Sequence, residues 1–248
     1  MNDKILIPPS EKIINIAKKY GWKEENIIKL NLPRWDKYNN ETRGLYYNGI
    51  KNNSIFIMFT WRQLKFNHKI SSFYIKNIIK LMTNNVLKRE LKINNITLYY
   101  TFHRFIYYSS LRATKGELSG QKNIKFIEQN QISDVLVQTN LVVSDFSSII
   151  FDLIYRRKPY ILYIPDSNEP NLKKIYRKDY YRLIDLMKKR AFEFENVYFS
   201  LYETINKILY YIRNKFQLET KLEKFYDSFS FKKGNNIDKF IEYLKALK

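Results

Sequence analysis

The chain has 248 residues, enough to form one large domain or two small ones around a sizeable core, and 45% of them are hydrophobic. The absence of cysteine excludes disulfides, thiolate zinc sites and cysteine nucleophiles, and it is typical of a protein of the reducing cytoplasm. An excess of 44 Lys and Arg over 24 Asp and Glu, formally +20, indicates either an anionic partner or the lysine-rich composition of an AT-rich genome.

Apolar periodicity predicts alternating helices and strands in the first part of the chain. A helix over 10–20 with Ser10 as its N-cap comes first, followed by a short strand over 27–32 and a polar loop over 39–53. The run S-I-F-I-M-F-T at 54–60 is apolar on both faces, as a central parallel strand requires. A long amphipathic helix is predicted over 71–91.

The same alternation continues along the second part. Further strands are predicted over 96–102, 124–127, 141–143 and 160–164, and further helices over 132–139, from about 147, over 202–216 and over 237–247. This order predicts an α/β fold with a doubly wound, Rossmann-like parallel sheet. We expect a leading segment at 1–53, a nucleotide-donor-binding domain at 54–216 and a C-terminal helical segment at 217–248.

A polar turn after the apolar run at 141–143 is the most informative stretch. Asp145, Ser147 and Ser148 stand at the start of a predicted helix, and Asp152 follows one turn later on roughly the same side. In a parallel sheet such a turn lies at the carboxyl end of a strand, where ligands bind, and serine hydroxyls suit a phosphate. Simple capping of the helix by Ser147 or Asp145 explains the same residues.

Basic residues also follow predicted strands. Arg62 comes after the strand at 54–60 and Arg34 after the strand at 27–32, and the planar guanidinium suits phosphate. His103 ends the strand at 96–102, where it either donates a proton near neutral pH or serves as a packing residue. The predicted donor- and phosphate-binding residues are Arg34, Arg62, Asp145, Ser147, Ser148 and Asp152, with His103 as the catalytic residue. Two distant histidines give no metal-ligand spacing, so neither a metal nor a cofactor is expected.

Four short blocks occur in order: L-P-R-W-D at 32–36, F-T-W-R at 59–62, F-H at 102–103 and V-S-D-F-S-S-I-I-F-D at 143–152, the last followed by K-P at 158–159. Their order resembles the CDP-glycerol glycerophosphotransferases, the teichoic-acid primases and polymerases. There the patterns read roughly G-x-P-R-x-D, P-T-W-R, K-x-H-P and T-D-Y-S-S-x-x-F-D, followed by K-P. Thr101 and Arg104 replace the lysine and the proline of the third block, so His103 is its matched residue.

The resemblance implies the C-terminal, donor-binding half of a GT-B fold. It implies a reaction in which an acceptor hydroxyl attacks the phosphorus next to the glycerol of CDP-glycerol and CMP leaves. Ser147 and Ser148 would hold the donor pyrophosphate, Arg62 and His103 would neutralise charge, and Asp152 would order the site. The expected partners are CDP-glycerol or another CDP-polyol, a polyol-phosphate or glycan-lipid acceptor, an anionic membrane surface, and a partner chain that carries the N-terminal half; no nucleic acid is expected.

Three functions stay open at this point. The first is a transferase, or the donor half of one, that acts on a cell-envelope polymer such as teichoic acid. The second is a non-catalytic module that binds a nucleotide or a polyanion. The third is a nucleic-acid or acidic-membrane binder driven by charge, whose binding would depend steeply on salt and would ignore Ser147 and Ser148. Because no apolar run approaches the ~20 residues that span a bilayer, we expect a cytoplasmic protein, peripheral at the inner face of the membrane.

Overall fold

The computed structural model of the chain describes residues 11–19, 21–30, 32–33, 35–36, 53–60, 62, 65, 72–103, 116–118, 120–189, 194–229 and 235–246. The chain forms two compact units. The helical unit consists of Met1–Ile50, Phe151–Arg157 and Leu218–Lys248, and the sheet unit consists of Lys51–Ile150 and Lys158–Gln217. The predicted domain boundaries at 53/54 and 216/217 stay a prediction.

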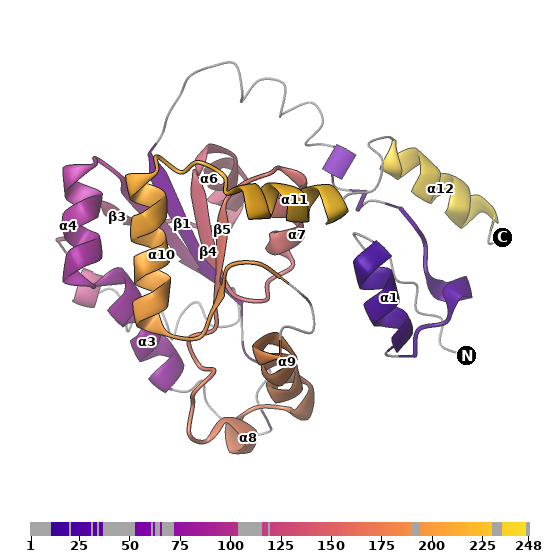
Figure 1. Cartoon of the computed structure of the whole chain (residues 1–248), viewed down its shortest axis with the longest axis horizontal. Helices are drawn as coiled ribbons and strands as arrows, with labels where there is room; N and C mark the ends of the chain where they lie inside the picture. Colours follow the sequence, from indigo (N-terminus) through magenta and orange to yellow (C-terminus); the bar gives the residue numbers. More distant parts are fainter. Residues whose placement is uncertain are drawn as a thin grey trace. The chain divides into compact units, whose positions relative to one another are not determined.

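The sheet unit is built on six parallel strands in the order β3-β2-β1-β4-β5-β6 (Figure 1). The strands are β1 (Ser54–Phe59), β2 (Thr97–Phe102), β3 (Ile124–Phe126), β4 (Leu141–Ser144), β5 (Tyr160–Tyr163) and β6 (Val197–Tyr198). The chain adds β2 and β3 on one side of β1 and then crosses back to add β4, β5 and β6 on the other. The predicted doubly wound parallel sheet is therefore confirmed, and its topological switch point lies between β1 and β4.

Helices cover both faces of this sheet. Helices α3 (Ser72–Met82), α4 (Asn85–Ile93) and α10 (Leu201–Arg213) lie together on one side (Figure 1). Helix α6 (Ile132–Gln138) connects β3 to β4 in the opposite lateral direction, so right-handed crossovers put it on the other face. Every residue of β4 and β5 is accordingly buried, which explains why their sequences are apolar throughout.

Two predicted elements differ in the structure. The helix predicted over 71–91 is two helices, because Asn84 leaves helical geometry and its side chain caps α4 by accepting a hydrogen bond from the Leu87 amide at 3.0 Å. The strand predicted over 27–32 is wrong for residues 27–30, where Ile27 makes a single bridge. Ile27 packs instead against Ile14 and Ala17 of α1 (Glu11–Lys19), so its apolar character reflects helix packing.

The segment after Asp166 holds structure that the sequence pattern did not predict. Helices α8 (Leu172–Ile175) and α9 (Lys178–Lys188) precede β6, which has two residues. The buried side of α9 carries Tyr180, Ile184 and Met187 at helical spacing. Its charged residues mask that spacing, because five of its eleven positions are exposed and carry Lys, Arg or Asp.

The helical unit gathers three separated stretches of chain. It contains α1, the short helix η1 (Glu24–Asn26), most of α7 (Ile149–Tyr155), α11 (Thr220–Phe229) and α12 (Asn236–Ala246). Asp36 caps α12 by accepting hydrogen bonds from the Asn236 side chain at 2.6 Å and the Ile237 amide at 2.7 Å. A further short helix, η2 (Gln129–Gln131), leads into α6 in the sheet unit. Within the described ranges, no helix is both long enough and apolar enough to cross a membrane.

Candidate functional site

The carboxyl ends of β1 and β4 lie side by side at the switch point. Met58 pairs with Ser144 in the sheet, and the Ser144 hydroxyl donates to the Met58 carbonyl at 2.7 Å. The F-T-W-R block continues from β1 and the serine block continues from β4. Two blocks that are about 85 residues apart in sequence therefore meet at one place on the sheet edge.

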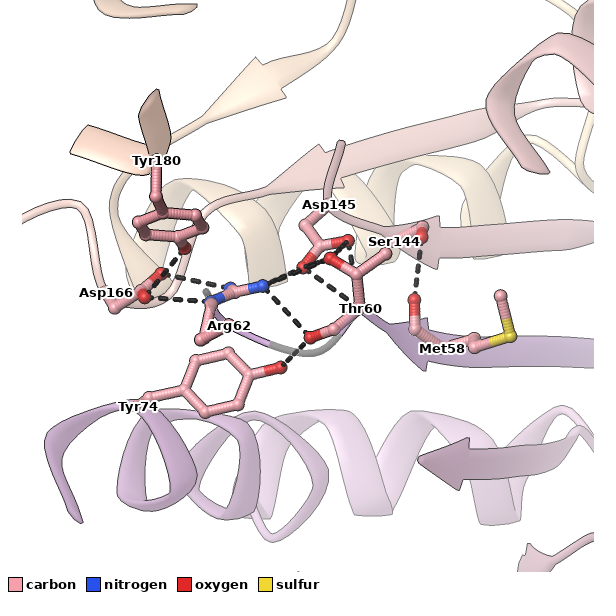
Figure 2. Close-up of polar contacts among 8 residues, drawn as sticks. All are labelled: Met58, Thr60, Arg62, Tyr74, Ser144, Asp145, Asp166 and Tyr180. Atoms are coloured by element: carbon pink, nitrogen blue, oxygen red, sulfur yellow. Dashed lines mark hydrogen bonds and ion pairs between the residues drawn. The ribbon is translucent and has the colours of Figure 1, made fainter. Parts of the chain in front are cut away.

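Asp145, the first residue after β4, bridges the switch point. It is fully buried, and its carboxylate accepts hydrogen bonds from the Thr60 amide at 3.1 and 3.2 Å and from the Thr60 hydroxyl at 3.0 Å. The backbone that follows β1 is thereby tied to the first residue of the serine turn. Figure 2 shows this contact beside the Ser144 to Met58 hydrogen bond.

Arg62 lies next to this bridge and is fully buried between two carboxylates (Figure 2). Its Nη1 donates to Asp145 at 2.5 Å, and its Nε and Nη2 donate to the two oxygens of Asp166 at 2.8 and 3.0 Å. Nη1 also donates to the Thr60 carbonyl at 3.1 Å. One arginine thus connects the chain segments that follow β1, β4 and β5, and we call Arg62, Asp145 and Asp166 the edge cluster.

Aromatic side chains enclose the guanidinium of Arg62. Its central carbon lies 4.0 Å from the ring centre of Tyr74, 5.1 Å from that of Phe146 and 5.3 Å from that of Tyr180. The Tyr180 hydroxyl donates to Asp166 at 2.8 Å, and the Tyr74 hydroxyl donates to the Thr60 carbonyl at 3.0 Å. These rings keep water from the edge cluster, and the Tyr180 hydroxyl supplies a neutral donor to it.

The pKa shifts follow from this enclosure. Burial opposes the positive charge of Arg62, but the Coulombic attraction of Asp166, with smaller contributions that include Asp145, raises the pKa of the guanidinium well above its ordinary value. Burial also raises the pKa of the Tyr74 and Tyr180 phenols well above the usual range, although the nearby Arg62 charge opposes that shift. At neutral pH the arginine is therefore charged and both phenols are neutral donors.

The serine turn presents its two hydroxyls differently. Ser147 is 6% exposed, and its hydroxyl accepts a hydrogen bond from the Ile149 amide at 3.4 Å, as an N-cap does at the start of α7. The Ser148 side chain is exposed. Ser147 thus has the capping contact, whereas Ser148 is exposed.

The other predicted site residues have different settings. His103 follows β2 directly and is partly exposed, whereas Arg34 lies outside the described residues. Asp152 belongs to the helical unit, where it is buried and accepts a hydrogen bond from the Trp35 indole at 2.9 Å. Trp35 also stacks on Tyr155 at 4.5 Å between ring centres. Asp152 therefore connects α7 to Trp35 of the first block within the helical unit.

The lysine of the K-P block has a structural contact as well. The Lys158 ammonium donates to the backbone carbonyls of Leu136, Val137 and Thr139 at 2.7, 2.7 and 2.5 Å. These carbonyls lie at the end of α6, where helix termini lack acceptor partners. Lys158 thus caps α6 from the loop before β5.

Asp166 and Tyr180 are the members of this arrangement that the sequence analysis missed. Asp166 comes shortly after the strand 160–164, so the strand-end reasoning that selected Arg62 applies to it equally. Tyr180 had no such signal, because it reaches Asp166 from α9, which the sequence pattern did not predict.

The fold and the carboxyl edge of the sheet define the class of this domain. A parallel sheet with one switch point, helices on both faces and polar residues gathered at the carboxyl edge is the architecture of Rossmann-like domains. The sequence then defines the family: the chain belongs to the CDP-Glycerol:Poly(glycerophosphate) glycerophosphotransferase family, whose pattern matches residues 1–245. The predicted family is therefore confirmed.

Known relatives agree with this assignment. The chain is 26% identical over 224 residues to the minor teichoic acid biosynthesis protein GgaB of Bacillus subtilis (strain 168), a match that covers 85% of this chain and 22% of GgaB. Among solved structures, it resembles a variant of the wall teichoic acid polymerase TagF soaked with CDPG, with a TM-score of 0.55 and 20% identity over 97% of this chain and 56% of that one. The chain thus spans about a fifth of GgaB and about half of TagF.

A second fold relative comes from a different reaction class. The UDP-GlcNAc 2-epimerase of Methanocaldococcus jannaschii, in complex with UDP-GlcNAc and UDP, matches with a TM-score of 0.59 and 13% identity over 98% of this chain and 61% of that one. At these identities the likenesses show the fold alone. They confirm the predicted α/β, GT-B-like architecture.

Proposed function

We propose that the chain binds a CDP-linked polyol donor such as CDP-glycerol at the carboxyl edge between β1 and β4. The polyol phosphate of the bound donor is then transferred to a hydroxyl of a cell-envelope polymer such as teichoic acid, and CMP is released. The observation that carries the proposal is the serine turn, which follows β4 at the switch point where Rossmann-like sheets bind their ligands. Family membership supports the chemical class of the donor.

Ser147 and Ser148 are the proposed ligands of the donor pyrophosphate. Ser148 is exposed. Ser147 accepts from the Ile149 amide through its oxygen, which leaves its O–H able to donate. His103 directly follows β2, the neighbour of β1, and we assign it a hydrogen bond to a donor phosphate oxygen or to the leaving CMP. Arg34 and Asp152 as donor ligands stay predictions.

The proposed transfer is an in-line displacement at phosphorus. A new bond forms between the acceptor oxygen and the phosphorus that carries the polyol, and the bond from that phosphorus to the bridging oxygen breaks, so that CMP leaves with the bonding electrons. The proton of the acceptor hydroxyl passes to a base. Because negative charge grows on the leaving oxygen, positioned O–H and N–H donors stabilise the transition state. The acceptor site and the base belong, in this proposal, to an N-terminal half.

Calorimetric titration of the purified chain with CMP, CDP-glycerol and CDP-ribitol tests the donor site. We expect Ser148→Ala to weaken binding about tenfold or more, since a hydrogen bond to a charged group is worth about 1.5–3 kcal/mol. Ser133→Ala is the matched control, because Ser133 is also exposed but lies on α6 after β3, three strands from β4. Absence of heat with all three nucleotides contradicts the proposal, as does wild-type affinity in Ser148→Ala.

A donor-binding module without turnover is the second candidate. The observation in its favour is the share of the relatives that the chain spans, 56% of TagF and 22% of GgaB. Release of CMP from CDP-glycerol after addition of a polyol-phosphate acceptor favours the transferase. Binding of the donor without release favours the module.

A further inference from the structure

The positive charge of Arg62 is paired with carboxylates inside the protein. All three of its guanidinium nitrogens donate to oxygens of Asp145, Asp166 or Thr60, at 2.5 to 3.2 Å. The side chain is 0% exposed and aromatic rings surround it. A phosphate that reached this guanidinium would have to displace a carboxylate and leave it buried without its counter-charge, which is costly.

The edge cluster carries a formal charge of −1, from one arginine and two aspartates that are all fully buried. Such a cluster attracts no anion. Its contacts instead hold the chain segments after β1, β4 and β5 in one arrangement, since each segment supplies one charged member. Its effect on an anionic donor is therefore indirect, through the shape of the turn that it anchors.

Both residues that precede the serine pair are held by this arrangement. Asp145 is bound by Thr60 and Arg62. The ring of Phe146 packs edge to face on Tyr180, with ring centres 5.2 Å apart and an interplanar angle of 69°. Tyr180 therefore makes two contacts, one to Phe146 with its ring and one to Asp166 with its hydroxyl at 2.8 Å.

We propose that Asp166 and Tyr180, together with Arg62, are positioning residues for the donor: they preorganise the serine turn by clamping Asp145 and Phe146, and they do not touch the donor themselves. This inference rests on the proposed function. It assigns a role to two residues outside the four family blocks, and it gives Arg62 a role in positioning in place of direct phosphate binding. Preorganisation raises affinity because the loop need not be ordered when the ligand binds.

A matched pair of variants tests the proposal. Tyr180→Phe removes the hydroxyl that donates to Asp166 at 2.8 Å, and Tyr211→Phe removes a hydroxyl that accepts from the Asn196 side chain at 2.9 Å. Both tyrosines are at most 4% exposed, but Asn196 precedes β6 and so lies at the amino end of that strand. The two variants thus lose the same group from equally buried places at opposite edges of the sheet.

The measurements are the melting temperature of each variant and its Kd for CMP, taken at a temperature where all variants are folded. We expect both variants to melt earlier than the wild type, but only Tyr180→Phe to raise the Kd, by about tenfold, the low end of the loss expected for a hydrogen bond to a charged group. In turnover assays Tyr180→Phe should raise KM for the donor and leave KM for the acceptor unchanged. A merely structural role does not produce that split.

Thr60→Val gives a second, milder variant that keeps every charge. It removes the hydroxyl contact to Asp145 at 3.0 Å while the Thr60 amide still donates, so we expect a smaller rise in Kd, of about threefold. Wild-type Kd values in both Tyr180→Phe and Thr60→Val overturn the proposal, and so does an equal rise in Tyr211→Phe. No heat from the wild-type chain with CMP or CDP-glycerol overturns the donor site itself, and this role with it.

Discussion

Replacement of Arg62 by methionine is the sharpest test of the physical account of the sheet edge. Methionine keeps most of the side-chain volume but leaves Asp145 and Asp166 buried without a cation. We expect Arg62→Met to lower the free energy of unfolding by about 4 kcal/mol, within the range for removing one partner of a buried ion pair. Thr60 and Tyr180 still donate to the two carboxylates, which keeps the loss from being larger.

Thermal melts followed by circular dichroism at neutral pH measure this loss. For a chain of this size, about 4 kcal/mol corresponds to a fall in the melting temperature of about 8–16 °C. The double variant Arg62→Met with Asp166→Asn should melt above Arg62→Met alone, because one of the two uncompensated charges is gone. That rescue separates an electrostatic penalty from a simple loss of packing.

Arg157 provides the matched control. It forms an ion pair with Asp227 at 2.6 Å, nearly the same distance as Arg62 to Asp145 at 2.5 Å, but its side chain is 43% exposed. We expect Arg157→Met to change stability by less than about 1 kcal/mol, since solvent screens exposed pairs. The reasoning fails if Arg62→Met melts within 3 °C, roughly the effect of 1 kcal/mol, of the wild type, or if the two arginine variants lose equal stability.

Three further predictions concern other contacts. Lys158→Met should destabilise the chain by about 1–2 kcal/mol through loss of the α6 cap, with unchanged affinity for CMP in calorimetry. Trp35→Phe keeps an aromatic ring but removes the donor to Asp152, so we expect a loss of about 1–2 kcal/mol in urea unfolding, and an equal midpoint in the variant would contradict that contact. Because the pKa values of Tyr74 and Tyr180 are raised by burial, stability is complete below about pH 10 and falls above it, and phenolate absorbance from these residues should rise together with unfolding and not before it.

The strands and most helices could be predicted because the spacing of apolar residues within each short segment shows which side chains become buried. The predicted strands at 54–60 and 160–164 contain the unbroken apolar runs 55–59 and 160–164, and β1 and β5 lie there with helices on both faces of the sheet. The break at Asn84 could not be predicted from periodicity, since the apolar spacing continues across it on two packed helices. Helix α9 was not predicted because its three buried residues are separated by exposed charged residues, so the apolar spacing is hard to recognise.

The sequence predicted several residues of the candidate site but not the contacts that they make. Strand-end reasoning selected Arg62 and Asp145, and the same reasoning applied to Asp166 would have completed the edge cluster. Whether an arginine after a strand faces a ligand or a carboxylate depends on which strands are its neighbours. Those partners lie 83 and 104 residues away along the chain, beyond the reach of any local pattern.

The sequence by itself determined the family, the α/β alternation and the serine turn, because family blocks and the periodic burial of side chains are properties of short segments. The tertiary structure decided the strand order, and with it which groups Arg62 contacts. Because β4 lies beside β1 and β5 lies beside β4, the carboxylates of Asp145 and Asp166 both reach the Arg62 guanidinium. Aromatic rings then enclose the guanidinium. Charge pairing acts through space, so only the folded arrangement could show that the arginine of the F-T-W-R block holds the sheet edge together from inside.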